Sequence, residues 1–290
     1  MRHLLGLAAL LFVAVQSSAA AKDYSVAGMV LTVDPSRNTF TASIEAIPGF
    51  MAAMAMPFEV RQLKDLDGVV PGAAVTFTLV VDQKSSHAER IRIVRYQSVE
   101  QDPLAVSRLK LLTNIAGAAR QKALTIGQTV PDFRLVDQKR RPVALSDLRG
   151  KVVAINFVYT SCALPGFCLR IANNFGVLQK RFKAQLGRDL ILLTVTFDPV
   201  HDTPEVLDQY ARRWAADAAT WHFLTGPVPD VQSVCQLFGV DFFPDEGLMN
   251  HSLHTALLDR HGKMVANIEG NRFTADQLGD LINAVLKPTP

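Results

Sequence analysis

The sequence predicts two domains of different class, a small all-β barrel of the OB type followed by an α/β domain. Three observations predict this organisation. Apolar residues alternate with a period of two across residues 24–97, which are rich in Thr, Val and Ile. From residue 125 onward, continuous apolar runs alternate with segments of helical spacing. Residues 98–124 show only weak periodicity, and 290 residues suffice for two modest cores.

The first 21 residues have the composition of a secretory signal peptide. A basic start at Arg2 and His3 precedes an apolar run over residues 4–15 and small residues at 18–21. The run is short for a membrane-spanning helix, so we expect residues 1–21 to be cleaved and the protein to be exported; an uncleaved anchor is the alternative. The formal net charge is +3, with Lys and Arg spread along the chain, so no nucleic-acid partner is expected.

Five strands are expected in the first domain, residues 24–97. Turn residues at 35–38 and 83–86 separate segments of strand composition. The expected strands are residues 24–34, 39–47, 57–60, 73–82 and 87–95. Short strands at this density suggest a small OB-type barrel. Residues 98–124 are expected to form a linker with a helical piece.

Strands and helices are expected to alternate in the second domain, residues 125–290. Two continuous apolar runs, residues 151–160 and 189–197, predict strands that are buried on both faces of a sheet. Helical patterns follow at residues 170–186, 202–214, 231–239 and 274–286. Thr274 and Gln277 have the positions of a capping box, and Asp202-Thr203 before Pro204 is typical of a helix start. A hairpin is expected through residues 259–263.

Cys162 and Cys168 flank a short loop between the strand 151–160 and the next helix. They could form a structural staple, a redox pair or a soft-metal site. A disulfide closing so small a loop would stabilise the fold by roughly 2 kcal/mol, which makes the staple the weaker interpretation. A helix N-terminus lowers a thiol pKa, so we expect Cys168 to be suited to reactivity or metal binding. Cys235, inside an apolar helix, is expected to be a core residue.

Residues 125–286 resemble the Sco/SenC family of thioredoxin-like copper proteins. The resemblance rests on TIGQTVPDFRLVDQ, on GKVVAINFVYTSC with the second cysteine, on TFDPVHDTPEVL and on NHSLHTALLDRHGKMV. The loop matches a family variant with five residues between the cysteines, although Ala163 and Leu169 stand where that variant has proline. The resemblance implies a thioredoxin-like fold and copper bound by Cys162 and Cys168.

The resemblance also implies a third ligand, a histidine that opens a strand ending in the turn at Asp259. Alignment favours His251, with His254 as the rival. Side chains alternate along a strand, so only one of the two is expected to face the cysteines. Either could instead be a hydrogen-bonded histidine at a strand edge.

Two thiolates and an imidazole suit Cu(I), and Cu(II) would add a weak donor. Structural zinc sites normally have four protein ligands. Asp198 and Asp202 match acidic positions that the family keeps near its site, where they would orient the ligands; capping a helix explains Asp202 equally well.

Met51, Met54 and Met56 lie within a single loop, AIPGFMAAMAMPFEV. Residues 24–97 resemble the small CusF-like periplasmic copper-binding domain, in which Met54 and Met56 match an M-x-M pair. That family's histidine ligand is replaced by Ile44 and its aromatic position by Met51. The resemblance therefore implies an all-thioether site for Cu(I) or Ag(I). Methionines that only fill the core are the alternative.

The two resemblances imply a periplasmic copper chaperone. The expected partner is the cytochrome c oxidase subunit carrying the binuclear copper centre, or another periplasmic copper acceptor, together with a thiol reductase. The alternative is an enzyme, a thiol-disulfide oxidoreductase or a peroxiredoxin-like protein that uses Cys162 and Cys168. The C-x-x-C spacing of most thioredoxin-like reductases is missing.

Overall fold

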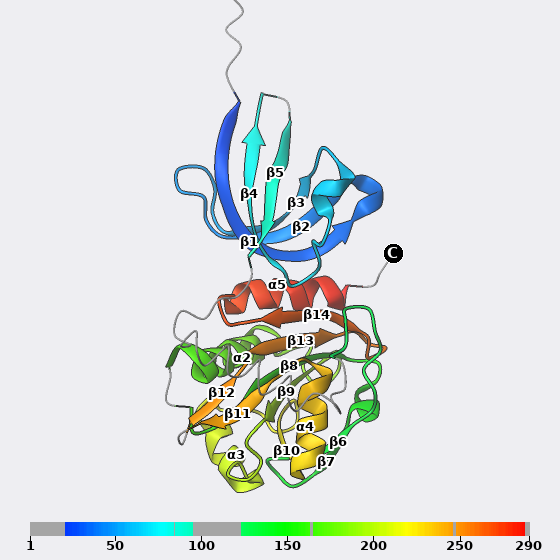
Figure 1. The fold of residues 1–290 in the computed structure, drawn as a ribbon, viewed down its shortest axis with the longest axis vertical. Helices are drawn as coiled ribbons and strands as arrows, with labels where there is room; N and C mark the ends of the chain where they lie inside the picture. Colours follow the sequence, from blue (N-terminus) through cyan, green and yellow to red (C-terminus); the bar gives the residue numbers. More distant parts are fainter. Residues whose placement is uncertain (1–20, 84, 95–122, 163–164, 246–247, 288–290) are drawn as a thin grey trace, which may run out of the picture.

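A computed structural model describes residues 21–83, 85–94, 123–162, 165–245 and 248–287. The predicted signal peptide, apart from Ala21, and nearly all of the predicted linker lie outside these residues. Figure 1 shows the five-stranded domain on one side of helix α5 and the larger α/β domain on the other. The predicted fold class, a small β domain followed by a thioredoxin-like α/β domain, is confirmed.

The first domain is an antiparallel sheet with the strand order β3-β2-β1-β4-β5. Its strands are β1 (Lys22–Asp34), β2 (Thr39–Ile44), β3 (Met54–Glu59), β4 (Ala74–Val81) and β5 (Ser86–Ile93). Val60, just after β3, forms a parallel bridge with Ala88 in β5. This bridge joins the two outer strands, as in an OB-type barrel.

Aromatic rings fill the barrel. Phe40, Phe58 and Phe77 are buried, with ring centroids 4.8 to 5.5 Å apart. Each comes from a different strand at an alternating position, so the period-two pattern of the sequence directs all three rings to one side of the sheet. Burying such rings stabilises a small domain by several kcal/mol in total, at about 25 cal/mol per Å² of apolar surface.

The second domain is built on a seven-stranded mixed sheet with the order β14-β13-β8-β9-β10-β6-β7. Its strands are β6 (Arg134–Asp137), β7 (Pro142–Ala144), β8 (Val152–Val158), β9 (Leu190–Thr196), β10 (Trp221–Thr225), β13 (His254–Leu258) and β14 (Met264–Glu269). The three central strands β8, β9 and β10 are parallel. Every residue of β8 and β9 is buried, as their continuous apolar runs predict.

Among the described residues, four α-helices and a separate hairpin complete the domain. They are α2 (Arg170–Arg181), α3 (Pro204–Arg212), α4 (Val228–Leu237), α5 (Ala275–Leu286), and the hairpin of β11 (Phe242–Asp245) and β12 (Leu248–His251). The capping box of Thr274 and Gln277 at the start of α5 is confirmed. The cap of α3 is the hydroxyl of Thr203, which accepts from the backbone N–H of Val206.

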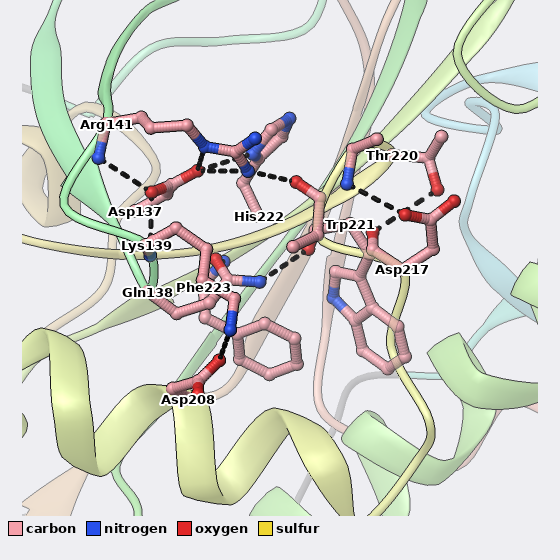
Figure 2. A network of polar contacts seen from close by, with 12 residues as sticks. Asp137, Gln138, Lys139, Arg141, Asp208, Asp217, Thr220, Trp221, His222 and Phe223 are labelled. Carbon is pink, nitrogen blue, oxygen red and sulfur yellow. Dashed lines mark hydrogen bonds and ion pairs between the residues drawn. The ribbon is translucent and has the colours of Figure 1, made fainter.

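A buried carboxylate fastens one edge of the sheet (Figure 2). Asp137 accepts hydrogen bonds from the backbone N–H groups of Lys139 and Arg141, and from Arg141 Nε at 2.9 Å. Its Oδ2 lies 3.2 Å from His222 Nδ1 on β10. Burial alone would raise the pKa of Asp137, but these donors outweigh it and lower the pKa. The turn between β6 and β7 is thus tied to β10.

The two domains pack against each other through β1, β2 and α5. Met29 and Leu31 of β1 belong to the apolar core of the second domain. Ser43 Oγ donates to Asp280 Oδ2 at 2.7 Å, and Gln277 Nε2 donates to the Ser43 carbonyl at 3.4 Å. A cavity of about 220 Å³ between the domains is lined by β1, β4, β14 and α5 and by neither Cys162 nor Cys168.

Candidate metal centre

The loop after β8 brings two thiols together. Cys162 is 7% exposed and Cys168 is fully buried, and both are thiols rather than a disulfide. The Cys168 thiol donates a hydrogen bond to the Cys162 sulfur. The backbone N–H of Cys162 also bonds to the Tyr159 carbonyl, which turns the chain back on itself directly after the strand. Two sulfur atoms at hydrogen-bonding distance are placed to share a soft metal ion or to be oxidised.

The expectation of a lowered pKa for Cys168 is wrong. Its pKa is raised well above the usual value, first by the hydrogen bond that it donates to Cys162 and then by burial. Cys168 lies in the segment Pro165–Leu169, which is kinked at Phe167, and α2 starts only at Arg170. Burial and a thiol partner therefore outweigh the helix N-terminus.

Asp202 anchors the cysteine loop. It is buried and accepts hydrogen bonds from the backbone N–H and the hydroxyl of Thr160, two residues before Cys162, and from the hydroxyl of Thr196 at the end of β9. Burial raises the pKa of this carboxyl. Because Thr203 caps α3, the capping interpretation of Asp202 is wrong.

Asp198 lies on the loop between β9 and α3, as Asp202 does, but its carboxylate has a different partner. Both of its carboxylate oxygens lie 2.9 Å from Nδ1 of the exposed His201, and this contact raises the pKa of the imidazole. The backbone N–H of Asp198 donates to the Thr196 hydroxyl. Thr196 therefore links Asp198 to Asp202, while the Asp198 carboxylate is held by His201.

His251 ends β12 and packs against the aromatic residues that border the cysteine loop. It is 5% exposed, and its ring centroid lies 4.7 Å from Phe197, 5.6 Å from Tyr159 and 6.4 Å from Phe167. Its Nδ1 lies 3.1 Å from the Ser252 carbonyl oxygen. Such a bond fixes the ring orientation of a histidine that binds metal through its other nitrogen.

His254 lies in a different environment. It opens β13 in the main sheet, and its Nδ1 lies 3.1 Å from Asn267 Oδ1 on β14. Burial lowers its pKa. The two histidines belong to separate strands in different sheets, so the alternation argument drawn from one continuous strand was wrong. The contacts of His251, rather than strand parity, place it beside the cysteine loop.

Tyr159 was not identified from the sequence, although it stands three residues before Cys162. Its hydroxyl donates to the Cys162 sulfur and accepts from the backbone N–H of Met249, and its ring meets His251 edge to face. Burial, followed by the neighbouring cysteines, raises its pKa to about 12. Within the described residues, no three His, Cys, Asp or Glu side chains stand close enough to hold a metal ion as they lie.

Met54 and Met56 lie on strand β3 rather than in the loop that the sequence predicts. Met54 and Met56 alternate with Ala55 along β3, so both lie on the face that carries Phe58 into the core. Met56 is half-buried and Met54 is 49% exposed. Met51 is half-buried, and its backbone forms an isolated antiparallel β-bridge with Ile47. The three methionines therefore differ in exposure, from the half-buried Met51 and Met56 to the exposed Met54.

Two further predictions from the sequence concern Ile44 and Cys235. Ile44 is buried and pairs directly with Met54 across β2 and β3, so an apolar side chain stands beside the methionine pair. Cys235 is fully buried in α4, and burial raises its pKa far above the usual value. Its predicted core position is confirmed.

Comparisons with known proteins match both halves of the chain. Residues 121–287 match the family described as SCO1/SenC, and residues 23–93 match the family described as copper binding periplasmic protein CusF. No helix among the described residues is long and apolar enough to cross a membrane.

Individual relatives are similar to the second half. The SCO2-like protein RT0576 of Rickettsia typhi is 29% identical over 141 residues, 46% of this chain and 66% of the relative. The SCO1 protein homolog of Bacillus subtilis is 30% identical over 97 residues, 33% of this chain and 49% of the relative. The chain thus spans about half to two thirds of these relatives. The crystal structure of a SCO1/SenC family lipoprotein from Bacillus anthracis has a TM-score of 0.51 at 22% identity, covering 58% of this chain and all of that one, and shows the same fold.

Proposed function

We propose that this chain, which belongs to the SCO1/SenC family, is a periplasmic copper chaperone. Cys162, Cys168 and His251 bind the copper that it delivers, and Met51, Met54 and Met56 form a second site. Residues 1–21 direct export, and residues 24–97 and 125–290 form the two copper-binding domains. The observation that carries the proposal is the pair of adjacent thiols bordered by the same aromatic group that contacts His251.

The donor set supports copper as the cargo. Thiolate and imidazole together are soft ligands, and three of them satisfy Cu(I). Tyr159 and Asp202 hold the start of the loop through hydrogen bonds to Cys162 and Thr160, so the chain can keep Cys162 near Cys168 while His251 approaches. Binding then needs movement of side chains at one end of the sheet and leaves the buried strands β8 and β9 in place.

The proposed acceptor is the subunit of cytochrome c oxidase that carries the binuclear copper centre, with another periplasmic copper protein as the alternative acceptor. A thiol reductase is the expected partner that keeps Cys162 and Cys168 reduced. In an oxidising compartment two adjacent thiols form a disulfide unless they are reduced or occupied by metal.

The test is copper transfer. The reduced full-length chain loaded with Cu(I) is mixed with the soluble copper-binding domain of the oxidase subunit, and the copper content of each protein is measured after separation. We expect copper to move to the acceptor, and the Cys162→Ser/Cys168→Ser double variant to deliver less. Equal delivery by the double variant would contradict the proposed role of the cysteine loop.

A thiol-disulfide oxidoreductase is the second candidate function. One observation favours it: Cys162 is slightly exposed and its sulfur accepts hydrogen bonds from both Cys168 and Tyr159, whereas Cys168 is fully buried. This asymmetry suits an attacking and a resolving thiol. A reductase would reduce a disulfide substrate catalytically without copper and would be insensitive to His251→Ala.

A further inference from the structure

Met249 lies on the strand that carries His251. The two residues are separated by one position in β12, so their side chains lie on the same face of the hairpin. The ring of His251 is buried against Tyr159 and Phe197, and Met249 packs against the same apolar core of the second domain. The hairpin therefore directs a thioether and an imidazole toward the same side.

Backbone contacts hold Met249 close to the cysteine loop. Its N–H donates to the Tyr159 hydroxyl, which in turn donates to the Cys162 sulfur. Two hydrogen bonds through a single phenol oxygen thus separate the main chain of Met249 from Cys162. The methionine side chain is unbranched and has three rotatable bonds, so its sulfur can reach positions that a shorter, branched side chain at residue 249 could not.

We infer that Met249 supplies a thioether ligand to Cu(I) at the site of Cys162, Cys168 and His251. This inference rests on the proposed function. A thioether is neutral and soft, so it strengthens binding of Cu(I) and contributes little to binding of Cu(II) or zinc. Met249 therefore determines specificity, by favouring the reduced ion over harder divalent ions. It also gives the second domain a ligand of the same kind as those on β3.

The test uses the full chain with Met51, Met54 and Met56 all changed to Leu, so that only the second site reports. In this background Met249→Leu keeps the side-chain volume and removes the sulfur. We expect affinity for Cu(I), measured by competition with a chromophoric chelator, to fall by on the order of tenfold, at the low end of losses seen around metal sites. Affinity for zinc should stay unchanged.

Met264→Leu is the matched control, because Met264 is a fully buried methionine of β14 in the same domain. It should leave Cu(I) affinity unchanged. A second measurement needs no substitution at Met249: the ¹³C methyl resonance of Met249 in the parent protein should shift when Cu(I) binds, and that of Met264 should not. This measurement holds even if Met249→Leu fails to fold.

The outcomes separate the two proposals. Loss of Cu(I) binding in Cys162→Ser and Cys168→Ser, with unchanged affinity in Met249→Leu and an unmoved Met249 resonance, would overturn the thioether ligand and leave the cysteine site standing. Cu(I) binding unchanged in both cysteine variants would overturn the copper function of this loop and the role of Met249 with it. A shifted resonance together with weaker binding in Met249→Leu supports the inference.

Discussion

The Cys168 thiol donates a hydrogen bond to the Cys162 sulfur, across a loop anchored by Asp202. The two sulfurs are therefore adjacent before any metal binds. This relationship accounts for both a shared metal ion and a disulfide, and the two states exclude each other because a disulfide has no thiolate to donate.

Oxidation should therefore release copper from the second site. Treatment of the Cu(I)-loaded chain with an oxidant that forms the Cys162–Cys168 disulfide removes both thiolate ligands, and copper should appear in solution until a reductant restores binding. Metal retained by the oxidised protein is measured after gel filtration. The Met54→Leu/Met56→Leu variant is used so that the barrel does not recapture the ion. Full retention of copper by the oxidised second domain would argue for histidine and carboxylate ligands instead.

Asp202→Ala should weaken copper binding by loosening the cysteine loop. The change leaves the half-buried N–H and hydroxyl of Thr160 without their acceptor, which lowers the free energy of unfolding by about 2 kcal/mol. Thr203→Ala is the control, because loss of this helix cap lowers stability by about 1 kcal/mol without touching the loop. We expect weaker Cu(I) binding only in Asp202→Ala. An equal loss of Cu(I) affinity in the two variants would show that Asp202 acts only through the overall stability of the domain.

Asp137 should contribute stability that depends on pH. Its pKa is lower in the folded chain than in the unfolded one, so its contribution is present above the unfolded value and is lost as pH falls through the folded value. At neutral pH, Asp137→Asn should lower the free energy of unfolding by about 2 kcal/mol, because hydrogen bonds to a charged group are lost. Urea unfolding at a series of pH values measures the difference between the two proteins, which should shrink below about pH 4. A difference that stayed constant down to acid pH would contradict this account of the carboxylate.

The methionine site should bind Cu(I) independently of pH. In the full chain carrying Cys162→Ser and Cys168→Ser, the remaining affinity for Cu(I) should vary little between pH 5 and 8, because a thioether has no proton to lose. Changing Met54 and Met56 to Leu should abolish most of that affinity, and Met29→Leu, at the domain interface, should not. Unchanged affinity after the double change would mean that these methionines only pack the barrel.

The barrel on its own is expected to fold less stably than it does in the full chain. Residues 22–93 contain all five strands, and their aromatic core is internal. Met29 and Leu31, however, lie in the core of the second domain, and Ser43 bonds to Asp280. We expect the isolated barrel to unfold at a lower urea concentration than the same domain in the full chain. Ser43→Ala in the full chain should reduce the difference between the two urea midpoints of barrel unfolding. Identical midpoints for the isolated barrel and the barrel in the full chain would show that the interface does not stabilise the barrel.

The sequence was informative where local periodicity decides the structure. The alternation that places Phe40, Phe58 and Phe77 in the barrel, the continuous runs of β8 and β9, and the caps at Thr203 and Thr274 all follow from short-range rules. The site was less predictable because it depends on contacts between distant segments. The pKa of Cys168 depends on burial and on Cys162, the role of Asp202 depends on Thr160 forty-two residues away, and the contact of Tyr159 with His251 arises only when β12 folds over the loop.

The placement of His251 and His254 in different sheets also depends on contacts between distant segments. Nothing in NHSLHTALLD marks the break between β12 and β13, which arises because the two strands pair in different sheets. Burial and hydrogen bonding to Asn267 then hold His254 against β14.

The most direct test of the copper site is the affinity of the reduced chain for Cu(I) when each cysteine of the loop, and His251 or His254, is replaced in turn. The parent protein for this test carries Leu at positions 51, 54 and 56, and competition with a chromophoric chelator gives the affinity of each variant. We expect Cys162→Ser, Cys168→Ser and His251→Ala each to weaken binding strongly, and His254→Ala to leave it unchanged. Weaker binding in His254→Ala with no change in His251→Ala, or unchanged binding in both cysteine variants, would contradict the site.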